Sequence, residues 1–158
     1  MAPAYQPWSA ERAAEIIAEH KAIEGATLVI LHALQDEFGY VPEPAIPMVA
    51  QALSLSRAEV HGAFTFYHDF RKEPAGRRVL KLCRAEACQA AGGDALAAQA
   101  EAKLGIAFGY TTADERVTLE PIYCLGLCAT APSAMLDDRV VGRLDEQRLD
   151  ALLAETLR

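Results

Sequence analysis

The residues best suited to carry chemistry are four cysteines, which form two short pairs. Cys83 and Cys88 are separated by four residues, Cys124 and Cys128 by three, and 35 residues lie between the two pairs. The chain of 158 residues contains no other cysteine. Two short pairs set among small and apolar residues are typical of a metal site with four thiolate ligands, closed by two loops of one fold.

Four thiolates can hold several kinds of metal centre. Soft sulfur ligands select zinc, copper(I) or iron–sulfur clusters. Structural zinc usually takes its ligands from tighter C-x2-C turns, whereas gaps of four and three residues suit a wider [2Fe–2S] cluster, in which each iron takes two thiolates. A Rieske centre needs nearby histidines, but all four histidines precede the first cysteine by at least 15 residues: His20, His32, His61 and His68. From the spacing, a [2Fe–2S] cluster, a zinc ion and disulfide-bonded or redox-active thiols all stay open.

Each cysteine pair follows a segment that we expect to be a β-strand. Val79 to Leu82 leads into the first pair, and Val117 to Tyr123 leads into the second. Between them, Gln89 to Leu104 predicts an alanine-rich helix, and a strand–helix–strand unit implies a parallel pair with a right-handed crossover. Neighbouring strand ends would therefore bring the two cysteine loops together at one edge of a sheet.

The rest of the second half predicts a small α/β layer. Ala134–Leu136 and Arg139–Val141 flank two aspartates and indicate a hairpin. Gly109 to Glu115 reads as a polar loop. A last helix begins near Leu144, with four leucines facing the sheet: Leu149, Leu152, Leu153 and Leu157. We expect a mixed sheet of four strands.

The first half predicts four amphipathic helices. Ser9 can cap the first, through about Lys21. The second runs from Thr27 to Phe38, and a following glycine stops it. The third spans about 45–53, and the fourth starts with the capping-box sequence of residues 56–59 and ends near residue 65. Such helices bury their apolar faces against one another, which predicts a helical bundle.

The segment 71–76 is polar and contains both proline and glycine, so it indicates a linker. We therefore predict an α+β protein with an N-terminal helical bundle over residues 1–72 and a second domain over residues 73–158.

Composition excludes several functions. The formal net charge is −7, from 15 basic and 22 acidic residues, and no basic cluster is longer than Arg77-Arg78, so a nucleic-acid surface is not expected. The first nine residues lack the basic and apolar parts of a signal peptide. No apolar run approaches the roughly 20 residues of a membrane span. We expect a cytoplasmic protein without a direct membrane span, and this compartment disfavours disulfides.

Longer stretches around these residues resemble a known family. The run Tyr123-Cys-Leu-Gly-Leu-Cys-Ala-Thr-Ala-Pro132, and the Thr-Phe-Tyr motif that ends at Tyr67, look like the thioredoxin-like [2Fe–2S] ferredoxin subunit of complex I. The likeness runs from about residue 9 to the C-terminus. It implies a thioredoxin-like second domain and a non-catalytic, one-electron carrier whose [2Fe–2S] cluster is held by Cys83, Cys88, Cys124 and Cys128. Thioredoxin-like folds often hold a cis proline before the third strand, which makes Pro132 the candidate for one.

Within that family, the sequence of three motifs is more similar to one branch than to the others. Cys83-Arg-Ala-Glu-Ala-Cys88, together with His61-Gly and His68-Asp-Phe-Arg71, resembles the gamma subunit of NAD-dependent, molybdenum-containing formate dehydrogenases. This resemblance implies two partners: a subunit that binds FMN and NADH, and a larger molybdenum and iron–sulfur subunit.

Three alternatives to a formate dehydrogenase subunit stay open. One is a subunit of an NADH-quinone oxidoreductase or hydrogenase of the same family, and another is a structural zinc-binding interaction module. The third, a thiol oxidoreductase, is weakened because the chain has no C-x-x-C at a helix start.

Overall fold

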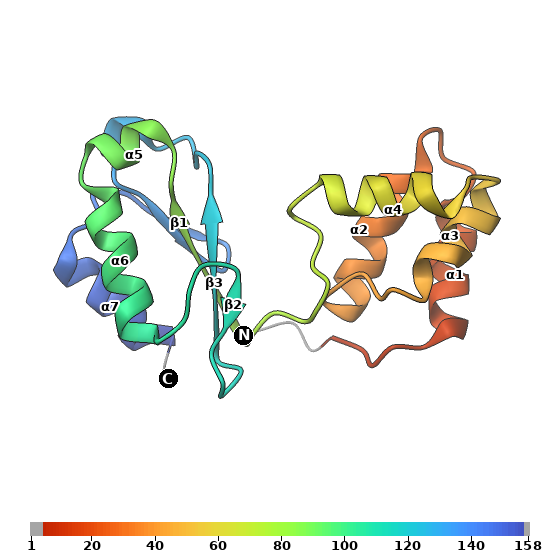
Figure 1. Ribbon diagram of the computed structural model, residues 1–158, viewed down its shortest axis with the longest axis horizontal. Coiled ribbons are helices and arrows are strands. Elements are labelled where there is room, and N and C mark those ends of the chain that lie inside the picture. Colours follow the sequence, from red (N-terminus) through yellow and green to blue (C-terminus); the bar gives the residue numbers. More distant parts are fainter. Residues whose placement is uncertain (1–4, 157–158) are drawn as a thin grey trace. The chain divides into compact units, whose positions relative to one another are not determined.

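The structure, a computed structural model, describes residues 5–156, which divide into two compact units. The boundary lies between Pro74 and Ala75, inside the segment that contains proline and glycine (Figure 1). The unit before the boundary is helical, and the unit after it contains a sheet with helices.

The helical unit contains the four expected helices: α1 (Ala10–His20), α2 (Ala26–Phe38), α3 (Ala45–Leu53) and α4 (Arg57–Phe66). Ser9 caps α1, because its hydroxyl accepts a hydrogen bond from the backbone N–H of Arg12. The predicted capping box of α4 is complete. The backbone N–H of Glu59 donates to the Ser56 hydroxyl at 3.2 Å, and the backbone N–H of Ser56 donates to the Glu59 carboxylate at 2.8 Å.

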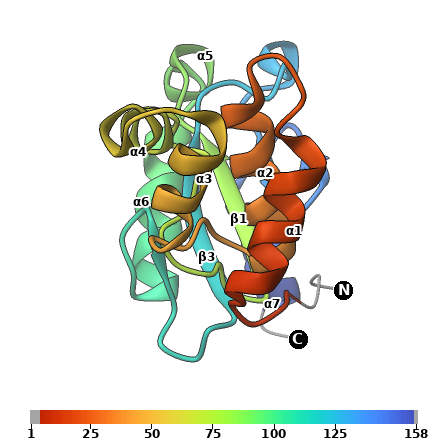
Figure 2. The ribbon, with the colours of Figure 1, turned by 90° about the vertical axis from the view of Figure 1, so that its right-hand side faces the viewer.

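Apolar faces of all four helices form the core of the bundle, and α1 and α2 lie side by side (Figure 2). Its fully buried larger side chains are Ile30, Leu31, Leu34, Phe38, Val41, Val49 and Val60. Gln35 is also buried, and the segment after α4 satisfies its amide: the side chain donates to the Asp69 carbonyl and accepts from the Arg71 N–H. This pairing fixes the segment that leaves the bundle.

The sheet of the second unit has five strands rather than the four predicted. The strands are β1 (Arg78–Cys83), β2 (Tyr110–Thr111), β3 (Val117–Ile122), β4 (Ala134–Leu136) and β5 (Arg139–Val141). Their order is β2-β3-β1-β4-β5, with β1 and β3 parallel and the other neighbours antiparallel. The predicted parallel pair and the predicted hairpin are confirmed.

The additional strand is β2, in the stretch predicted to be a polar loop. Tyr110 and Thr111 pair with Leu119 and Thr118, and the hydroxyls of Thr111 and Thr118 lie 2.7 Å apart. Two residues are too few to show the alternation that identifies a strand in a sequence. The strand exists because β3 has a free edge to pair with.

The helix predicted from Gln89 to Leu104 is wrong as one element. It is two helices, α5 (Glu86–Ala90) and α6 (Gly93–Leu104), because Gly92 between them has a φ of 92°. That left-handed conformation interrupts a right-handed helix.

Two longer helices, α6 and α7 (Glu146–Thr156), lie on the same face of the sheet (Figure 1). They cover a core centred on Leu80, Leu119, Leu136 and Leu149, all fully buried or nearly so. Leu149, Leu152 and Leu153 face this core as predicted, whereas Leu157 lies outside the described residues. None of the helices within residues 5–156 has the length and apolar character needed to cross a membrane.

Candidate metal centre

The two cysteine loops leave the sheet at the same edge. In the parallel pair of β1 and β3, Cys83 lies opposite Ile122, and these are the last residues of their strands. The backbone N–H of Arg84 donates to the Ile122 carbonyl at 2.8 Å and extends the pairing by one step. Cys88 then lies in α5, and Cys124 follows soon after β3. Cys128 begins the short 3-10 helix Cys128–Thr130.

The first pair is buried. Only 4% of Cys83 and 2% of Cys88 are exposed. The backbone N–H of Cys83 donates to the Ser133 carbonyl at 3.0 Å, and the sulfur of Cys88 lies 3.5 Å from the Ser133 hydroxyl. The inner side of the site is therefore enclosed by β1, α5 and the segment before β4.

The second pair is exposed. The sulfurs of Cys124 and Cys128 lie 3.5 Å apart, and the backbone N–H of Gly126 donates to the Cys124 sulfur at 3.3 Å. The loop depends on unusual backbone angles, since Cys124 has a φ of 87° and Gly126 a φ of 75°. The site consequently has an inner, buried pair and an outer pair open to solvent.

Hydrogen bonding and burial act in opposite directions on these thiols. Burial raises the pKa of Cys83, but hydrogen bonds from the backbone N–H groups of Ala85 and Cys124 and from the side chains of Cys88 and Ser133 outweigh it, so the pKa of Cys83 lies below its ordinary value. The hydrogen bond to Cys124 and the charge on that sulfur raise the pKa of Cys128. Donors aimed at a sulfur favour the thiolate, which is the form that binds metal.

Two further contacts fix the loop of the first pair. Gly93 passes so close to Cys88 that an added Cβ would lie 2.6 Å from the Cys88 carbonyl oxygen. Arg84 forms an ion pair with Asp94 at 3.0 Å, and its guanidinium lies 5.2 Å from the centre of the Phe108 ring. The chain between the two buried cysteines is thus anchored to the start of α6 and to the segment after it.

The thiols fit a binuclear iron–sulfur cluster. All four cysteines are free, so none is withdrawn into a disulfide. Throughout residues 5–156, no three histidine, cysteine or carboxylate side chains are grouped tightly enough to hold one metal ion. Each cysteine lies beside its pair partner. The sulfurs of Cys124 and Cys128 are in contact, and a hydrogen bond joins Cys83 and Cys88. Two close pairs match a cluster in which each of two irons takes two thiolates.

Sequence reasoning missed Ser133 and Gly93 as parts of this site. The only signal for Ser133 was a hydroxyl placed directly before a predicted buried strand, and for Gly93 it was the double glycine after Cys88.

The Ala131–Pro132 peptide is cis, as the family resemblance suggested. The aromatic residues at the end of α4 divide between two environments: Phe64 and Phe70 are core, whereas Phe66 and Tyr67 are exposed.

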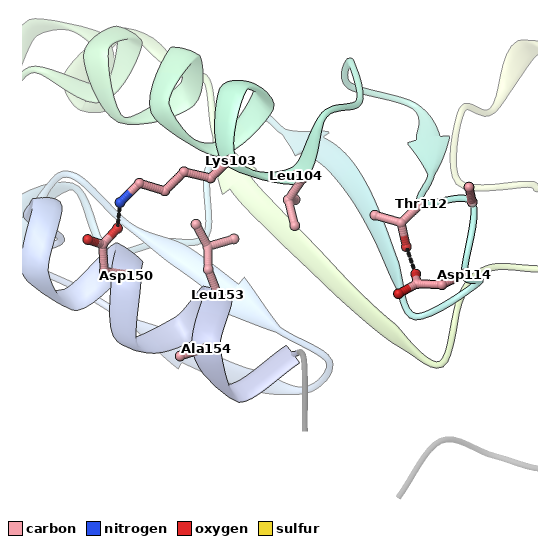
Figure 3. A pocket seen from close by; sticks show the side chains of 8 residues that line it. Lys103, Leu104, Thr112, Asp114, Asp150, Leu153 and Ala154 are labelled. Atoms are coloured by element: carbon pink, nitrogen blue, oxygen red, sulfur yellow. Dashed lines mark hydrogen bonds and ion pairs between the residues drawn. The ribbon is translucent and has the colours of Figure 1, made fainter.

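A cavity of about 570 Å³ lies elsewhere in the second unit. Figure 3 shows its lining from the end of α6, the turn between β2 and β3, and α7: Lys103, Leu104, Thr112, Ala113, Asp114, Asp150, Leu153 and Ala154. Its charged groups are already partnered, since Lys103 forms an ion pair with Asp150 and Thr112 donates to Asp114 at 2.6 Å. The hydrogen bond from Thr112 lowers the pKa of Asp114. No cysteine lines this cavity, which is separate from the thiolate site.

Comparison with known proteins adds a family and several relatives. Residues 13–157 match the profile of the thioredoxin-like [2Fe-2S] ferredoxin family. A subunit of the NADH-quinone oxidoreductase of Pseudomonas aeruginosa is 37% identical over 117 residues, which are 74% of this chain and 70% of that protein. A subunit of the Rhizobium meliloti NADH-quinone oxidoreductase is 42% identical over 128 residues, 81% and 76% of the two chains. The HndA subunit of the NADP-reducing hydrogenase of Solidesulfovibrio fructosivorans is 32% identical over 132 residues, which are 84% of this chain and 77% of that protein.

Solved structures include a similar segment within a longer polypeptide. A chain of an air-oxidized NAD+-reducing [NiFe]-hydrogenase superimposes with a TM-score of 0.69 at 30% identity. The match covers 83% of the present chain but only 22% of the hydrogenase chain.

Proposed function

Because this chain belongs to the thioredoxin-like [2Fe–2S] ferredoxin family, whose cofactor is a [2Fe–2S] cluster, we propose that its four cysteines are the ligands of that cluster. The ligands are Cys83, Cys88, Cys124 and Cys128. The observation that carries this proposal is that both loops of free cysteines follow the adjacent ends of the parallel strands β1 and β3.

The chain's own groups suit electron transfer. When bound, a [2Fe–2S] cluster accepts and returns one electron at a time and makes no bond to a substrate. Backbone N–H groups of Ala85, Cys124 and Gly126 point at ligand sulfurs, and such donors stabilise negative charge there. The buried inner pair is shielded from water, while the outer pair stays open. These features describe a carrier subunit and not a catalytic centre.

Electrons enter and leave most directly on the exposed side of the site. Cys124 and Cys128 are exposed, and Tyr123 beside them is 73% exposed. Large aromatic side chains are enriched where proteins dock. A redox partner that covers Tyr123 would bring its own cofactor next to the outer pair.

The relatives support a place in a multi-subunit assembly. These are subunits of an NADH-quinone oxidoreductase and of a hydrogenase, so the carrier serves a multi-subunit oxidoreductase linked to a nicotinamide nucleotide. We propose that it exchanges electrons with a subunit that binds FMN and NADH. We place the assembly in the cytoplasm, whose reducing conditions suit a site in which none of the four cysteines forms a disulfide.

Among such assemblies we favour an NAD-dependent, molybdenum-containing formate dehydrogenase. The support comes from the sequence of residues 83–88 and from the motifs around the histidines at 61 and 68. These motifs resemble the gamma subunit of that enzyme. The alternatives are an NADH-quinone oxidoreductase and a hydrogenase, which the relatives represent.

Purification of the native assembly through a tag on this chain tests the proposal. The pure complex is supplied anaerobically with NAD+ and either formate or hydrogen, or with NADH and a quinone. We expect NADH to form with formate alone. Reduction of NAD+ by hydrogen, or oxidation of NADH by quinone without any formate activity, would assign the subunit to one of the alternatives.

A further inference from the structure

Ser133 stands in an unusual position for a polar side chain. It lies between the cis peptide at Pro132 and the first residue of β4, and only 2% of it is exposed. Its carbonyl accepts the hydrogen bond from the Cys83 N–H at 3.0 Å. The backbone of Ser133 is therefore fixed against the end of β1, which also fixes where its side chain begins.

The hydroxyl of Ser133 is directed at sulfur. It lies 3.5 Å from the Cys88 sulfur, and it also hydrogen-bonds the sulfur of Cys83. A buried hydroxyl without a hydrogen-bond partner is unfavourable, and here the sulfurs supply the partners. Ala134 and Leu136 of the following strand are buried and apolar.

The direction of the hydrogen bond changes with the state of the cysteines. Between neutral groups, either the thiol or the hydroxyl can donate. A thiolate has no hydrogen and can only accept, so a metal-ligating Cys83 or Cys88 leaves the Ser133 O–H as the donor. This hydrogen bond is charge-assisted and stronger than a neutral one.

Resting on the proposed function, we infer that Ser133 is a positioning residue that raises the reduction potential of the site by donating its hydroxyl hydrogen to the buried ligand sulfurs. Reduction by one electron adds one negative charge, shared between the irons and their sulfurs. A donor at a ligand sulfur stabilises the more negative state, and hydrogen bonds to sulfur are among the factors that set these potentials.

The test compares midpoint potentials of loaded proteins. Ser133→Ala removes the hydroxyl, and we expect a shift to a more negative potential with unchanged iron and sulfide content. Thr118→Val is the matched control, because it also removes a buried hydroxyl, one that serves Gly76 and Thr111 at the far end of β3. Its potential should equal that of the wild type.

A second pair of variants separates hydrogen bonding from packing. Ser133→Thr and Ser133→Val differ little in volume, but only threonine keeps the donor. We expect the valine protein to have the more negative potential of the two. Equal potentials in this pair, or an unchanged potential in Ser133→Ala, would overturn the inference while leaving the four-cysteine site intact. A wild-type protein that binds no cluster would instead overturn the proposed function.

Discussion

Cys83 and Ile122 lie opposite each other as the last residues of two parallel strands, and this register starts both cysteine loops at one edge of the sheet. Cys124 follows Ile122 by two residues, so both loops start from the same step of the sheet. Parallel strands necessarily present their carboxyl ends at one edge. At such an edge the sheet fixes where the two loops start, and the loops carry the cysteines.

We predict that replacing any one of the four cysteines by serine removes most of the bound iron. Two thiolates for each of two irons leave no spare ligand among the described cysteines. The measurement is iron and acid-labile sulfide per chain after anaerobic reconstitution, with the spectrum of the reduced protein. A variant with the wild-type spectrum and iron content would show that the replaced cysteine is not a ligand.

We predict that cluster binding requires glycine at position 126, because the backbone there is left-handed. Its φ is 75° and a Cβ would meet no atom within 4 Å, so Gly126→Ala adds strain without a clash. A side chain in this region is unfavourable by roughly 1–2 kcal/mol. We expect a loss of cluster occupancy, because the strain falls on the loop that holds Cys124 and Cys128.

Gly25 provides the control for Gly126. It has a φ of 69° and equally open surroundings, but it precedes α2 in the bundle. Gly25→Ala should lower the stability of the bundle and leave iron content unchanged. Equal iron loss in both variants would argue against a specific role for the Gly126 loop.

Gly93→Ala should destabilise the protein although alanine is the better helix former. The new Cβ would lie 2.6 Å from the Cys88 carbonyl oxygen, so the backbone must shift. We expect about 1–3 kcal/mol lower free energy of unfolding in the metal-free protein. Gly62→Ala, in α4 with nothing within 4 Å, should instead stabilise by roughly 0.5–1 kcal/mol. If both variants changed the free energy of unfolding in the same direction, the close contact at Gly93 would be contradicted.

The capping box of α4 should make the bundle sensitive to acid. Hydrogen bonds from the Ser56 backbone and hydroxyl lower the pKa of Glu59. The folded pKa is depressed, so this contribution to stability is complete above the unfolded pKa and is lost as the pH falls through the folded pKa.

Denaturant unfolding at neutral and at acidic pH measures this effect. Ser56→Ala should lower the free energy of unfolding by about 1 kcal/mol at neutral pH. Glu59→Gln should reduce the difference in stability between the two pH values. A wild-type pH dependence in Glu59→Gln would assign the acid sensitivity to other carboxylates.

Features with a strong local signal could be predicted from the sequence. Ser56 and Glu59 carry their own capping pattern, and α1 to α4 follow from apolar periodicity and capping residues. Cys83 and Cys124 could be placed at one sheet edge because parallel strands fix which ends meet. The caps and helices are determined by residues a few positions apart, and the shared sheet edge follows from the topology of a strand–helix–strand unit.

Features that depend on distant partners could not be predicted. Strand β2 forms because Tyr110 and Thr111 find the free edge of β3, and a two-residue strand has no periodicity of its own. The break before α6 depends on the conformation that Gly92 adopts rather than on its presence. Ser133 acquires a role only because Cys83 and Cys88, 45 residues or more earlier, face its hydroxyl.

The most direct test of the account is the spectrum and composition of the protein reconstituted anaerobically with iron and sulfide. We expect two irons and two acid-labile sulfides per chain, visible absorption bands that bleach with dithionite, and an electron paramagnetic resonance signal that appears only on reduction. A colourless protein with one zinc ion, or a metal-free protein whose thiols cycle with disulfides, would contradict it.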